Sequence, residues 1–340
     1  ARHWYDFGHL TLFYQSKCDL LISRSFNSID GNNHTITKTS KQTAKMHAEA
    51  SWFENLPSKF LMNTPRFIGR KNKDQRAGYE LEYLHLPTLS DMLVFGRLNS
   101  NSIALILSRC VQLLAEFRSL RPERDAPESS EDYAKSFYQE VIQRKTWSRF
   151  ESFCADFGCN LNTRYILNGE TLPPLDEIIN AALSKIPMTR PEDISFWHGD
   201  FFFGNLFFDF NAQRIIMVDP RGMLFDNVIT QYGDYRYDVG KLSHSILGGY
   251  DHIISNQAKF RQLSHHEFEF LLPSFERAEH KFAKERLCSL VEAEFGMNSQ
   301  ELNALAVIMF FSALPLHLDN PERQAALFAN GLSLSRNLKV

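Results

Sequence analysis

The chain has 340 residues and a mass of 39.4 kDa, with 44% apolar and 23% charged residues. This length favours two packed lobes over a single compact core, and the composition excludes a disordered or fibrous chain. A formal net charge of −3, with the basic residues scattered along the chain, argues against a nucleic-acid binder.

The first part of the chain, residues 1–86, predicts a small lobe of mixed α and β structure. Short β-prone runs surround the turn-forming sequence Asp-Gly-Asn-Asn, and a helix-forming stretch follows them. The expected elements are a hairpin over 19–40 with its turn at 30–33, a helix that begins near Thr43 and stops near Pro57, and two strands at 65–69 and 78–87 joined by a polar turn over 70–76.

After Pro87 the pattern changes to apolar residues at helical spacing, which predicts a larger helical lobe over residues 87–340. A β-prone pair interrupts this pattern near its middle, and everything from Gly240 onward is expected to be helical. The expected elements are helices over 88–96, 102–120, 133–157, 266–295 and 301–318, and a hairpin that pairs 206–209 with 214–218. The fold class is therefore α+β, with an antiparallel sheet in the first lobe and helices in the second.

The cysteines and the apolar runs indicate in which cellular compartment the protein is expected. The five cysteines are odd in number and lack paired CxxC spacing, which argues against a disulfide framework or a zinc site and favours the cytoplasm. No run reaches the roughly 18 apolar residues that a membrane span needs. The chain begins at Ala1 without an initiator methionine, and two explanations stay open, a processed form and a domain of a longer protein.

Three polar side chains around the central hairpin form a candidate reaction centre. Asp200 follows an apolar run, Asn205 comes five positions later, and Asp219 ends the next strand before Pro220. Amide and carboxylate oxygens are hard ligands of the kind that Mg²⁺ takes, and a further carboxylate can orient an acceptor hydroxyl for phosphoryl transfer from ATP. The set predicts a magnesium-dependent phosphotransferase, with Asp200 as the catalytic carboxylate and Asn205 and Asp219 as metal ligands.

The stretches HGDFFFGN and VDPRG resemble the active-site signature of the aminoglycoside phosphotransferase and choline kinase family, relatives of the protein kinases. The resemblance implies a bilobal protein kinase-like fold, with ATP and Mg²⁺ as cofactors. In that family the Asp of HGD is catalytic, and the following Asn and the later Asp bind the metal. These roles fall on Asp200, Asn205 and Asp219. DPRG departs from the antibiotic-resistance members and leaves the acceptor open.

The same resemblance assigns residues of the small lobe and one carboxylate of the large lobe. Lys38 resembles the phosphate-pairing lysine and Glu49 its helix partner, although Lys41 competes for the first role and pairing with Lys45 is an alternative for Glu49. ELEYL resembles the hinge between lobes, and GDYRYDVGKLSHS resembles the helix start that supports the catalytic loop. The hinge implies adenine contacts from Glu82 and Leu84, and the helix start implies a buried carboxylate at Asp238.

A narrower resemblance concerns the biological setting. WYDFGH, RSFNSI, ITKTS and PLHLDNPER resemble the kinase-type domain of bacterial capsule and surface-polysaccharide proteins, which can follow a sugar nucleotidyltransferase domain. This implies a hydroxyl acceptor that is a sugar, a polyol, an amino alcohol or a derivative. It also implies a covalently linked nucleotidyltransferase domain before this chain.

The remaining polar residues near the centre have two interpretations each. Arg221 and Arg236 are candidates for binding an anionic substrate, because guanidinium groups match carboxylate and phosphate, and they are equally suited to neutralising the neighbouring aspartates. His198 is expected to orient the loop through a backbone hydrogen bond. Two alternatives to the kinase remain, a nucleotide-binding module without transfer activity, favoured by the lack of a Gly-rich loop, and a metal-dependent phosphohydrolase with water as acceptor.

Overall fold

The computed structural model describes residues 27–31, 34–73, 76–224 and 227–338. The chain divides into two compact units, Ala1–Pro87 with Asn205–Gln231, and Thr88–Gly204 with Tyr232–Val340. The first boundary lies beside the predicted one, but the segment Asn205–Gln231 groups with the first unit. The functional division into 1–86 and 87–340 stays a prediction.

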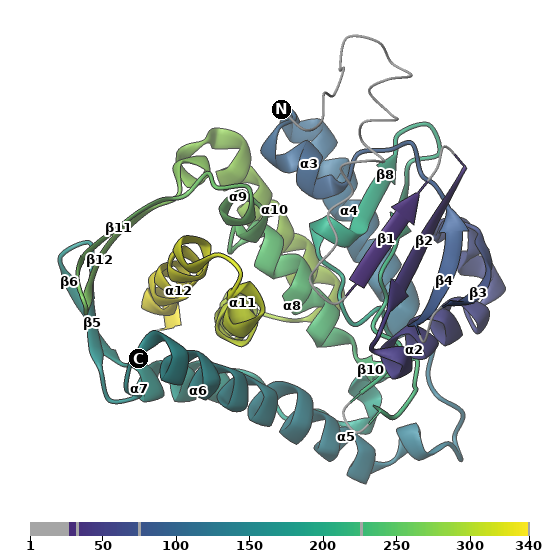
Figure 1. Cartoon of the computed structure of the whole chain (residues 1–340), viewed down its shortest axis with the longest axis horizontal. Coiled ribbons are helices and arrows are strands. Elements are labelled where there is room, and N and C mark those ends of the chain that lie inside the picture. Colours follow the sequence, from purple (N-terminus) through teal and green to yellow (C-terminus); the bar gives the residue numbers. More distant parts are fainter. Residues whose placement is uncertain (1–26, 32–33, 74–75, 225–226, 339–340) are drawn as a thin grey trace. The chain divides into compact units, whose positions relative to one another are not determined.

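A four-stranded antiparallel sheet with strand order β1-β2-β4-β3 forms the centre of the first unit (Figure 1). Helix α2 packs against this sheet, and the ring of its Phe53 lies 5.6 Å from that of Tyr79. The predicted helix and both predicted hairpins are confirmed in the described residues. The elements are β1 (Asn27–Gly31), β2 (Thr35–Ser40), α2 (Thr43–Glu54), η1 (Ser58–Asn63), β3 (Phe67–Lys73), β4 (Arg76–Glu82), β8 (Leu206–Asp209) and β9 (Arg214–Met217).

One local prediction for this unit is wrong. The polar stretch 70–76 was expected to be a turn, but β3 and β4 extend into it, with Arg70 opposite Tyr79 and Lys71 opposite Gly78. The polar side chains are tolerated because this part of β3 has an exposed face, where lysine and arginine reach solvent. The start of the predicted first hairpin, 19–26, its turn residues Asn32 and Asn33, and the sequence WYDFGH lie outside the described residues.

The second unit is mainly helical, as predicted. A run of helix from Glu131 to Phe157 is continuous through a π-helical segment, and Figure 1 shows it as one long element. The helices are α3 (Leu89–Val94), α4 (Ser100–Arg118), η2 (Pro127–Ser129), α5 (Glu131–Phe137), η3 (Tyr138–Arg144), α6 (Lys145–Phe157), α7 (Leu175–Ser184), η4 (Pro191–Asp193), α8 (Tyr235–Ile246), α9 (Tyr250–Ile254), η7 (Pro273–Glu276), α10 (Ala278–Phe295), α11 (Ser299–Ala313), η8 (Leu314–His317), α12 (Pro321–Ser335) and η9 (Arg336–Leu338). The short turn η5 (Phe203–Asn205) spans the boundary between the units.

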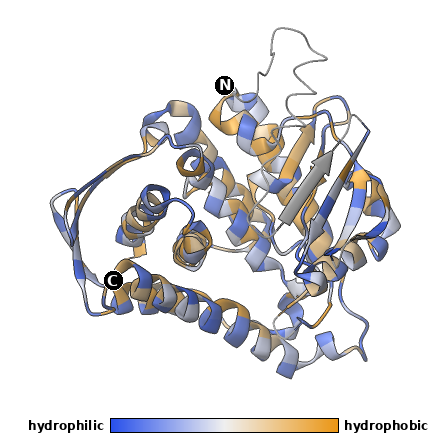
Figure 2. Cartoon of the chain, in the orientation of Figure 1, coloured by the Kyte–Doolittle hydropathy of each residue, from blue (hydrophilic) through white to orange (hydrophobic). Residues whose placement is uncertain are grey.

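Helix α11 forms the core of this unit. It packs against α8, α12, α6 and α7, and every residue from Leu302 to Ser312 is buried. The run Ser299–His317 is the one stretch of the described residues long and apolar enough to cross a membrane, and 72% of its most apolar part is buried, as in a core helix. The surrounding α6 is two-sided, and Figure 2 shows both hydrophobic and hydrophilic residues along it. Its apolar side buries Phe150 and Phe153.

The prediction that everything after Gly240 is helical is wrong for residues 259–271. This segment forms two antiparallel strands that join a second, earlier hairpin in a four-stranded sheet of order β11-β12-β5-β6. Two further strands form a separate antiparallel pair beside the HGD sequence. The strands of the second unit are β5 (Arg164–Leu167), β6 (Glu170–Pro174), β7 (Ile194–Phe196), β10 (Tyr232–Asp234), β11 (Lys259–Ser264) and β12 (Glu267–Leu271).

Candidate active site

The β8–β9 hairpin of the first unit brings Asn205 and Asp219 to the same end. Leu206 pairs with Met217, and the Val218 N–H donates to the Asn205 carbonyl over 3.0 Å. Asn205 is therefore opposite Val218, one position before Asp219. Asn205 is buried, whereas the Asp219 side chain keeps 43% of its surface exposed. The hairpin thus brings the backbones of Asn205 and Asp219 to one end, and the metal-binding roles of their side chains stay predictions.

The backbone around Asp219 is shaped by close packing against α2. Asp219 itself has a φ of +57°, in the left-handed region that Asp adopts more readily than most residues. Gly222 has a φ of +64°, and a Cβ placed there would lie 2.2 Å from the carbonyl oxygen of Ala48. Only glycine fits at this position, so the turn that follows Asp219 is held against α2.

Lys38 joins Asp219 to α2. Its Nζ lies 2.7 Å from Glu49 Oε2 and 3.0 Å from Asp219 Oδ1. The lysine and Glu49 side chains are 8% and 2% exposed, so this is a buried ion pair. Lys45 also approaches Glu49, at 3.7 Å, which is a weaker contact than that of Lys38. Lys41 is exposed one residue beyond the end of β2.

Charge and burial oppose each other in this cluster. Burial lowers the pKa of Lys38, but the carboxylates of Asp219 and Glu49 outweigh it, so the pKa is raised above the usual value and the ammonium is retained. Burial also raises the pKa of Glu49, against the opposing effect of Lys38. The attraction between Lys38 and Glu49 offsets the cost of removing both charges from water.

Tyr79 completes this cluster and was not identified from the sequence. Its hydroxyl donates to Glu49 Oε2 over 2.7 Å and lies 3.5 Å from Asp219 Oδ1. Burial, Glu49 and Asp219 raise the pKa of Tyr79 well above its ordinary value, so the phenol stays protonated and donates. The signal that could have found it is strand register, because Tyr79 of β4 stands directly opposite Lys38 of β2.

The two predicted hinge residues lie at and just after the end of β4. Glu82 pairs with Thr35, and its backbone N–H donates to the Arg66 carbonyl over 2.9 Å. Leu84 follows β4 and is half-buried. Adenine contacts from Glu82 and Leu84 stay predictions.

In the second unit the HGD loop is held by a buried carboxylate on α8. Asp238 accepts the backbone N–H of His198 at 2.7 Å and of Gly199 at 2.9 Å. The Asp200 N–H in turn donates to Nδ1 of His198 over 3.3 Å, which is the loop-orienting contact expected of this histidine. Burial raises the pKa of Asp238 to about 7, even though the His198 and Gly199 N–H groups lower it. These contacts fix the backbone on both sides of Gly199 and leave the Asp200 side chain partly exposed.

Lys241 is the second residue that sequence reasoning missed. Its Nζ lies 2.8 Å from Asp200 Oδ1, with the two side chains 19% and 36% exposed. Lys241 is three residues after Asp238 on α8, so both project from one face of the helix toward the same loop. That helical spacing was the available signal.

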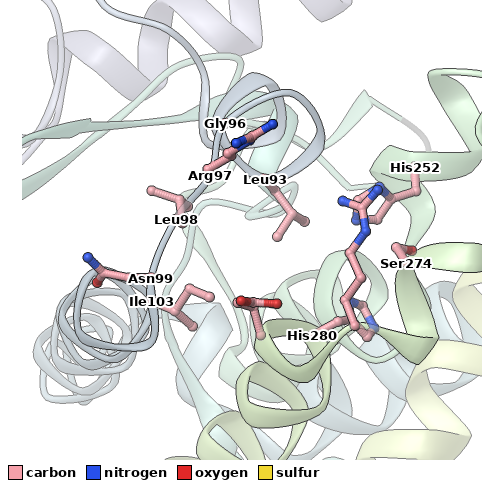
Figure 3. A pocket seen from close by; sticks show the side chains of 11 residues that line it. Leu93, Gly96, Arg97, Leu98, Asn99, Ile103, His252, Ser274 and His280 are labelled. Carbon is pink, nitrogen blue, oxygen red and sulfur yellow. The ribbon is translucent and has the colours of Figure 1, made fainter.

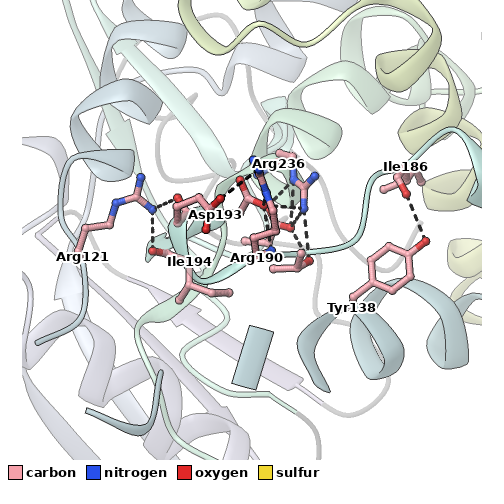
Figure 4. A network of polar contacts seen from close by, with 10 residues as sticks. Arg121, Tyr138, Ile186, Arg190, Asp193, Ile194 and Arg236 are labelled. Carbon is pink, nitrogen blue, oxygen red and sulfur yellow. Dashed lines mark hydrogen bonds and ion pairs between the residues drawn. The ribbon is translucent and has the colours of Figure 1, made fainter. Parts of the chain in front are cut away.

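The two candidate substrate arginines differ in their surroundings. Arg236 is 6% exposed, and its Nε donates to Asp234 Oδ1 over 2.9 Å, while its Nη2 lies 3.4 Å from Asp193 Oδ2. Figure 4 shows this guanidinium inside a network of polar contacts, with Arg121 bonded nearby to the Ile194 carbonyl. The geometry favours neutralisation of aspartates for Arg236. Arg221 is half-buried, and a substrate role for either arginine stays a prediction.

The oxygen donors of the hairpin fit a magnesium ion that shares its ligands with phosphate. Within the described residues no group of three or more His, Cys, Asp and Glu side chains could hold a metal by itself. Mg²⁺ is commonly held by one or two carboxylates, with substrate phosphates and waters as the other ligands. Asn205 and Asp219 are a donor set of this incomplete kind.

Comparisons with known proteins identify the family of the chain. Residues 33–251 match the phosphotransferase enzyme family, and the chain belongs to this family. A comparison with curated proteins gives no match. The prediction of a phosphotransferase is thereby confirmed at the level of the family.

Solved structures give the fold. A Ralstonia eutropha protein provisionally assigned as an aminoglycoside phosphotransferase has 13% identity and a TM-score of 0.50, over 96% of this chain and 97% of that one. A Mesorhizobium loti choline/ethanolamine kinase family protein has 12% identity and a TM-score of 0.45, over 96% and 99%. The aminoglycoside phosphotransferase APH(4)-Ia, as a thermostable mutant with ADP and hygromycin B, has 12% identity and a TM-score of 0.47, over 96% and 98%. The first of these confirms the predicted α+β, kinase-like fold.

Proposed function

We propose that this protein is an ATP- and magnesium-dependent kinase that phosphorylates a hydroxyl group of a sugar, polyol, amino alcohol or derivative. The proposal assigns nucleotide binding to residues 1–86 and acceptor binding to residues 87–340. The observation that carries it is the buried pairing of Lys38 with both Glu49 and Asp219. This pairing places a fixed cation beside a carboxylate that can bind a metal ion.

In this proposal Lys38 binds the phosphates of ATP while Glu49 and Tyr79 hold its side chain in place. Glu49 contacts the ammonium at 2.7 Å, and Tyr79 fixes Glu49 by donating a 2.7 Å hydrogen bond to it, so little ordering is needed when the phosphate arrives. Glu82 and Leu84 are the proposed adenine contacts, through their backbone groups.

Asn205 and Asp219 would hold the magnesium ion, which supplies positive charge to the phosphate oxygens when bound. The Asp219 carboxylate, at 43% exposure, is accessible to a ligand even while one of its oxygens contacts Lys38. A phosphate group that binds Lys38 therefore competes with Asp219 for contact with the Lys38 ammonium.

Asp200 is the proposed catalytic carboxylate that accepts a hydrogen bond from the acceptor hydroxyl and orients it. Its loop is fixed by Asp238, so the carboxylate is held on a rigid support. Lys241 Nζ lies 2.8 Å from Asp200 Oδ1 and helps to hold this side chain in place. We propose that Lys241 also stabilises charge on the transferring phosphoryl group.

The test is transfer from magnesium ATP to a panel of sugars, polyols and amino alcohols, with products identified by mass spectrometry. Asp200→Asn should lower the rate by about 10²–10⁴-fold, because general base and orientation contributions have that size. Asp132→Asn, which changes an exposed carboxylate in the first turn of α5, is the matched control and should leave the rate unchanged.

Three outcomes would contradict the proposal. An unchanged rate in Asp200→Asn would remove the catalytic assignment. Nucleotide binding without turnover on any acceptor would indicate a binding module, and loss of ATP with no acceptor present would indicate a phosphohydrolase.

We further propose a role in the synthesis of surface polysaccharides in the cytoplasm, after a linked nucleotidyltransferase domain. The support is the likeness of WYDFGH, RSFNSI, ITKTS and PLHLDNPER to capsule-type kinase domains. The free thiols of Cys110, Cys154, Cys159 and Cys288 are compatible with a reducing compartment. Detection of the phosphorylated product in cell extracts, and its loss on deletion of the gene, is the test.

A further inference from the structure

A cavity in the second unit lies outside the residues assigned to phosphoryl transfer. It has a volume of about 300 Å³ and is enclosed by the end of α3, the start of α4, α9, η7 and the start of α10 (Figure 3). Leu93, Leu98 and Ile103 form an apolar wall, and His252, Ser274 and His280 lie across from them in Figure 3. The volume is at the lower limit of ligand pockets, roughly 300 Å³, which suits one ring-sized molecule.

The polar side of this cavity contains buried groups without partners. His280 is 4% exposed and Ser274 is 2% exposed. Both ring nitrogens of His280 and the hydroxyl of Ser274 have no hydrogen-bond partner in the described part of the chain. Buried polar groups are nearly always satisfied, because leaving one unsatisfied is costly, so these atoms are suited to hydrogen-bond a ligand in the cavity.

The two imidazoles are neutral and offer both a donor and an acceptor. Burial lowers the pKa of His280 to about 3, assisted by Lys284, His252 and Arg277, and burial also lowers the pKa of His252. Nδ1 of His252 lies 2.9 Å from Oε1 of Gln257, an amide oxygen that can only accept, so Nδ1 carries the proton and Nε2 is left as an acceptor. His280 stacks on Phe275, with ring centroids 4.6 Å apart, which fixes its plane.

The edge of the cavity is charged. Arg97, Arg277 and Glu279 line it and are exposed, giving a formal excess of one positive charge. A hydroxyl group both donates and accepts hydrogen bonds, as this polar side requires, and the C–H face of a sugar ring suits an apolar wall. A guanidinium matches a phosphate or carboxylate substituent.

From this cavity we infer a second binding site, for a monosaccharide-sized polyol that carries one phosphate or carboxylate group. The hydroxyls bond to His252, Ser274 and His280, and the anionic group lies at Arg277 on the edge. This inference does not rest on the proposed function, because none of these residues belongs to the proposed reaction centre. Helix α9 lies near the HGD loop, since the ring centroids of its Tyr250 and of Phe202, two residues after Asp200, are 5.7 Å apart.

The experiment is titration of the full chain, without nucleotide, with glucose 6-phosphate, glucuronate, glucose and inorganic phosphate, followed by calorimetry and by the ¹H–¹³C resonances of the histidine rings. We expect saturable binding of glucose 6-phosphate or glucuronate, with shifts at His252 and His280. Glucose and inorganic phosphate should each bind at least about tenfold more weakly, because each lacks one half of the contacts.

Two variants test the contacts. Arg277→Gln should weaken binding by about tenfold or more, and Ser274→Ala by about fivefold. Ser274→Ala removes an unpartnered buried hydroxyl, so the midpoint of thermal unfolding should stay the same or rise while binding weakens. Arg124→Gln, an exposed arginine elsewhere, is the control and should bind normally.

The inference is overturned if no probe gives a saturable shift of His280 at about 10 mM, since a site of useful affinity would be occupied at that concentration. Equal affinity for inorganic phosphate and glucose 6-phosphate would overturn the sugar assignment. Binding that is unchanged in both pocket variants would place the ligand elsewhere. The titration uses no nucleotide and follows the His280 ring, so failure here and failure of the proposed kinase activity are distinguishable.

Discussion

Each unit holds a lysine paired with a carboxylate that we assign to phosphoryl transfer, and the two pairs differ in burial. Lys38 is 8% exposed and contacts two carboxylates, Glu49 and Asp219. Lys241 is 19% exposed and lies 2.8 Å from Asp200, which is 36% exposed. Both distances are those of direct ion pairs, so geometry alone does not separate the two.

Burial does separate them, because it decides what happens when one partner is removed. A buried charge that loses its partner keeps the cost of desolvation without the compensating attraction, whereas an exposed charge that loses its partner is hydrated by solvent. The Lys38 pair should therefore be required for folding and for function together. The Lys241 pair should be required mainly for function.

The largest expected effect comes from breaking the buried pair. Lys38→Met leaves buried Glu49 with only the weaker contact of Lys45 at 3.7 Å, so the free energy of unfolding should fall by up to about 3–5 kcal/mol. Loss of the phosphate-binding cation should also lower the transfer rate by about 10²–10³-fold. Denaturant unfolding and the acceptor assay measure the two effects on the same preparation.

A double variant distinguishes the two losses. Lys38→Met with Glu49→Leu replaces the ion pair by apolar groups, which should recover most of the stability and none of the activity. Lys41→Met changes an exposed lysine beside β2 and should alter stability by no more than about 0.5 kcal/mol. If Lys38→Met unfolds no more easily than Lys41→Met, the pair contributes no more than a surface contact.

The second pair should give a smaller effect, and one confined to activity. Lys241→Met removes the charge beside Asp200, and we expect the transfer rate to fall by about 100-fold, or about 2.7 kcal/mol of transition-state stabilisation. The free energy of unfolding should fall by less than about 1 kcal/mol, because the pair is partly hydrated.

Two controls accompany this variant. Lys241→Arg keeps the charge and should recover part of the rate, and Lys135→Met, on the exposed side of α5, should behave like the unmodified protein. A loss of stability without a loss of rate would give Lys241 a structural role and make the two pairs alike.

The residues of the two lysine–carboxylate pairs and of the hairpin differ in how far they could be predicted from the sequence. The closeness of Asn205 and Asp219 was accessible because a short hairpin with known turn residues brings its ends together whatever the rest of the chain does. Asp200 lies outside that hairpin, and its role stays a prediction. The pairing of Lys38 with Glu49 depended on resemblance to a family, since spacing alone allowed Lys41 and Lys45 as alternatives. Membership of the phosphotransferase family and the kinase-like fold were predicted on the same grounds.

What could not be predicted depends on register and on distant packing. Tyr79 meets Glu49 only when β2 and β4 pair in one particular register, and Lys241 meets Asp200 only when α8 is placed under the loop. The second sheet was missed because β12 pairs in parallel with β5, about a hundred residues earlier. Buried Phe268 and Phe270 alternate with exposed Glu269, which is the period of two typical of a strand, although a helix was predicted there.

The smallest expected effect concerns pH and again separates the units. Asp238, which supports the Asp200 loop, has a pKa of about 7 against an ordinary 3.8, so the folded protein holds a proton that the unfolded chain has released above pH 4. Its contribution to stability is therefore complete below about pH 4 and is lost as the pH rises through 7. Between pH 6 and 8 this loss should be about 1.4 kcal/mol. The raised pKa of Lys38 predicts no titration of that residue in this range.

The measurement is the free energy of unfolding from pH 6 to 8 in the unmodified protein and in Asp238→Asn, which cannot titrate. The difference between the two proteins isolates this carboxyl from His244, His252 and His280, whose lowered pKa values make stability rise with pH below about 6.5. The unmodified protein should lose about 1.4 kcal/mol relative to the variant. If the difference does not change with pH, Asp238 is ionised throughout, and its two backbone hydrogen bonds outweigh its burial. In that case the support of the Asp200 loop, like the Lys38 ammonium of the first unit, would not respond to pH near neutrality.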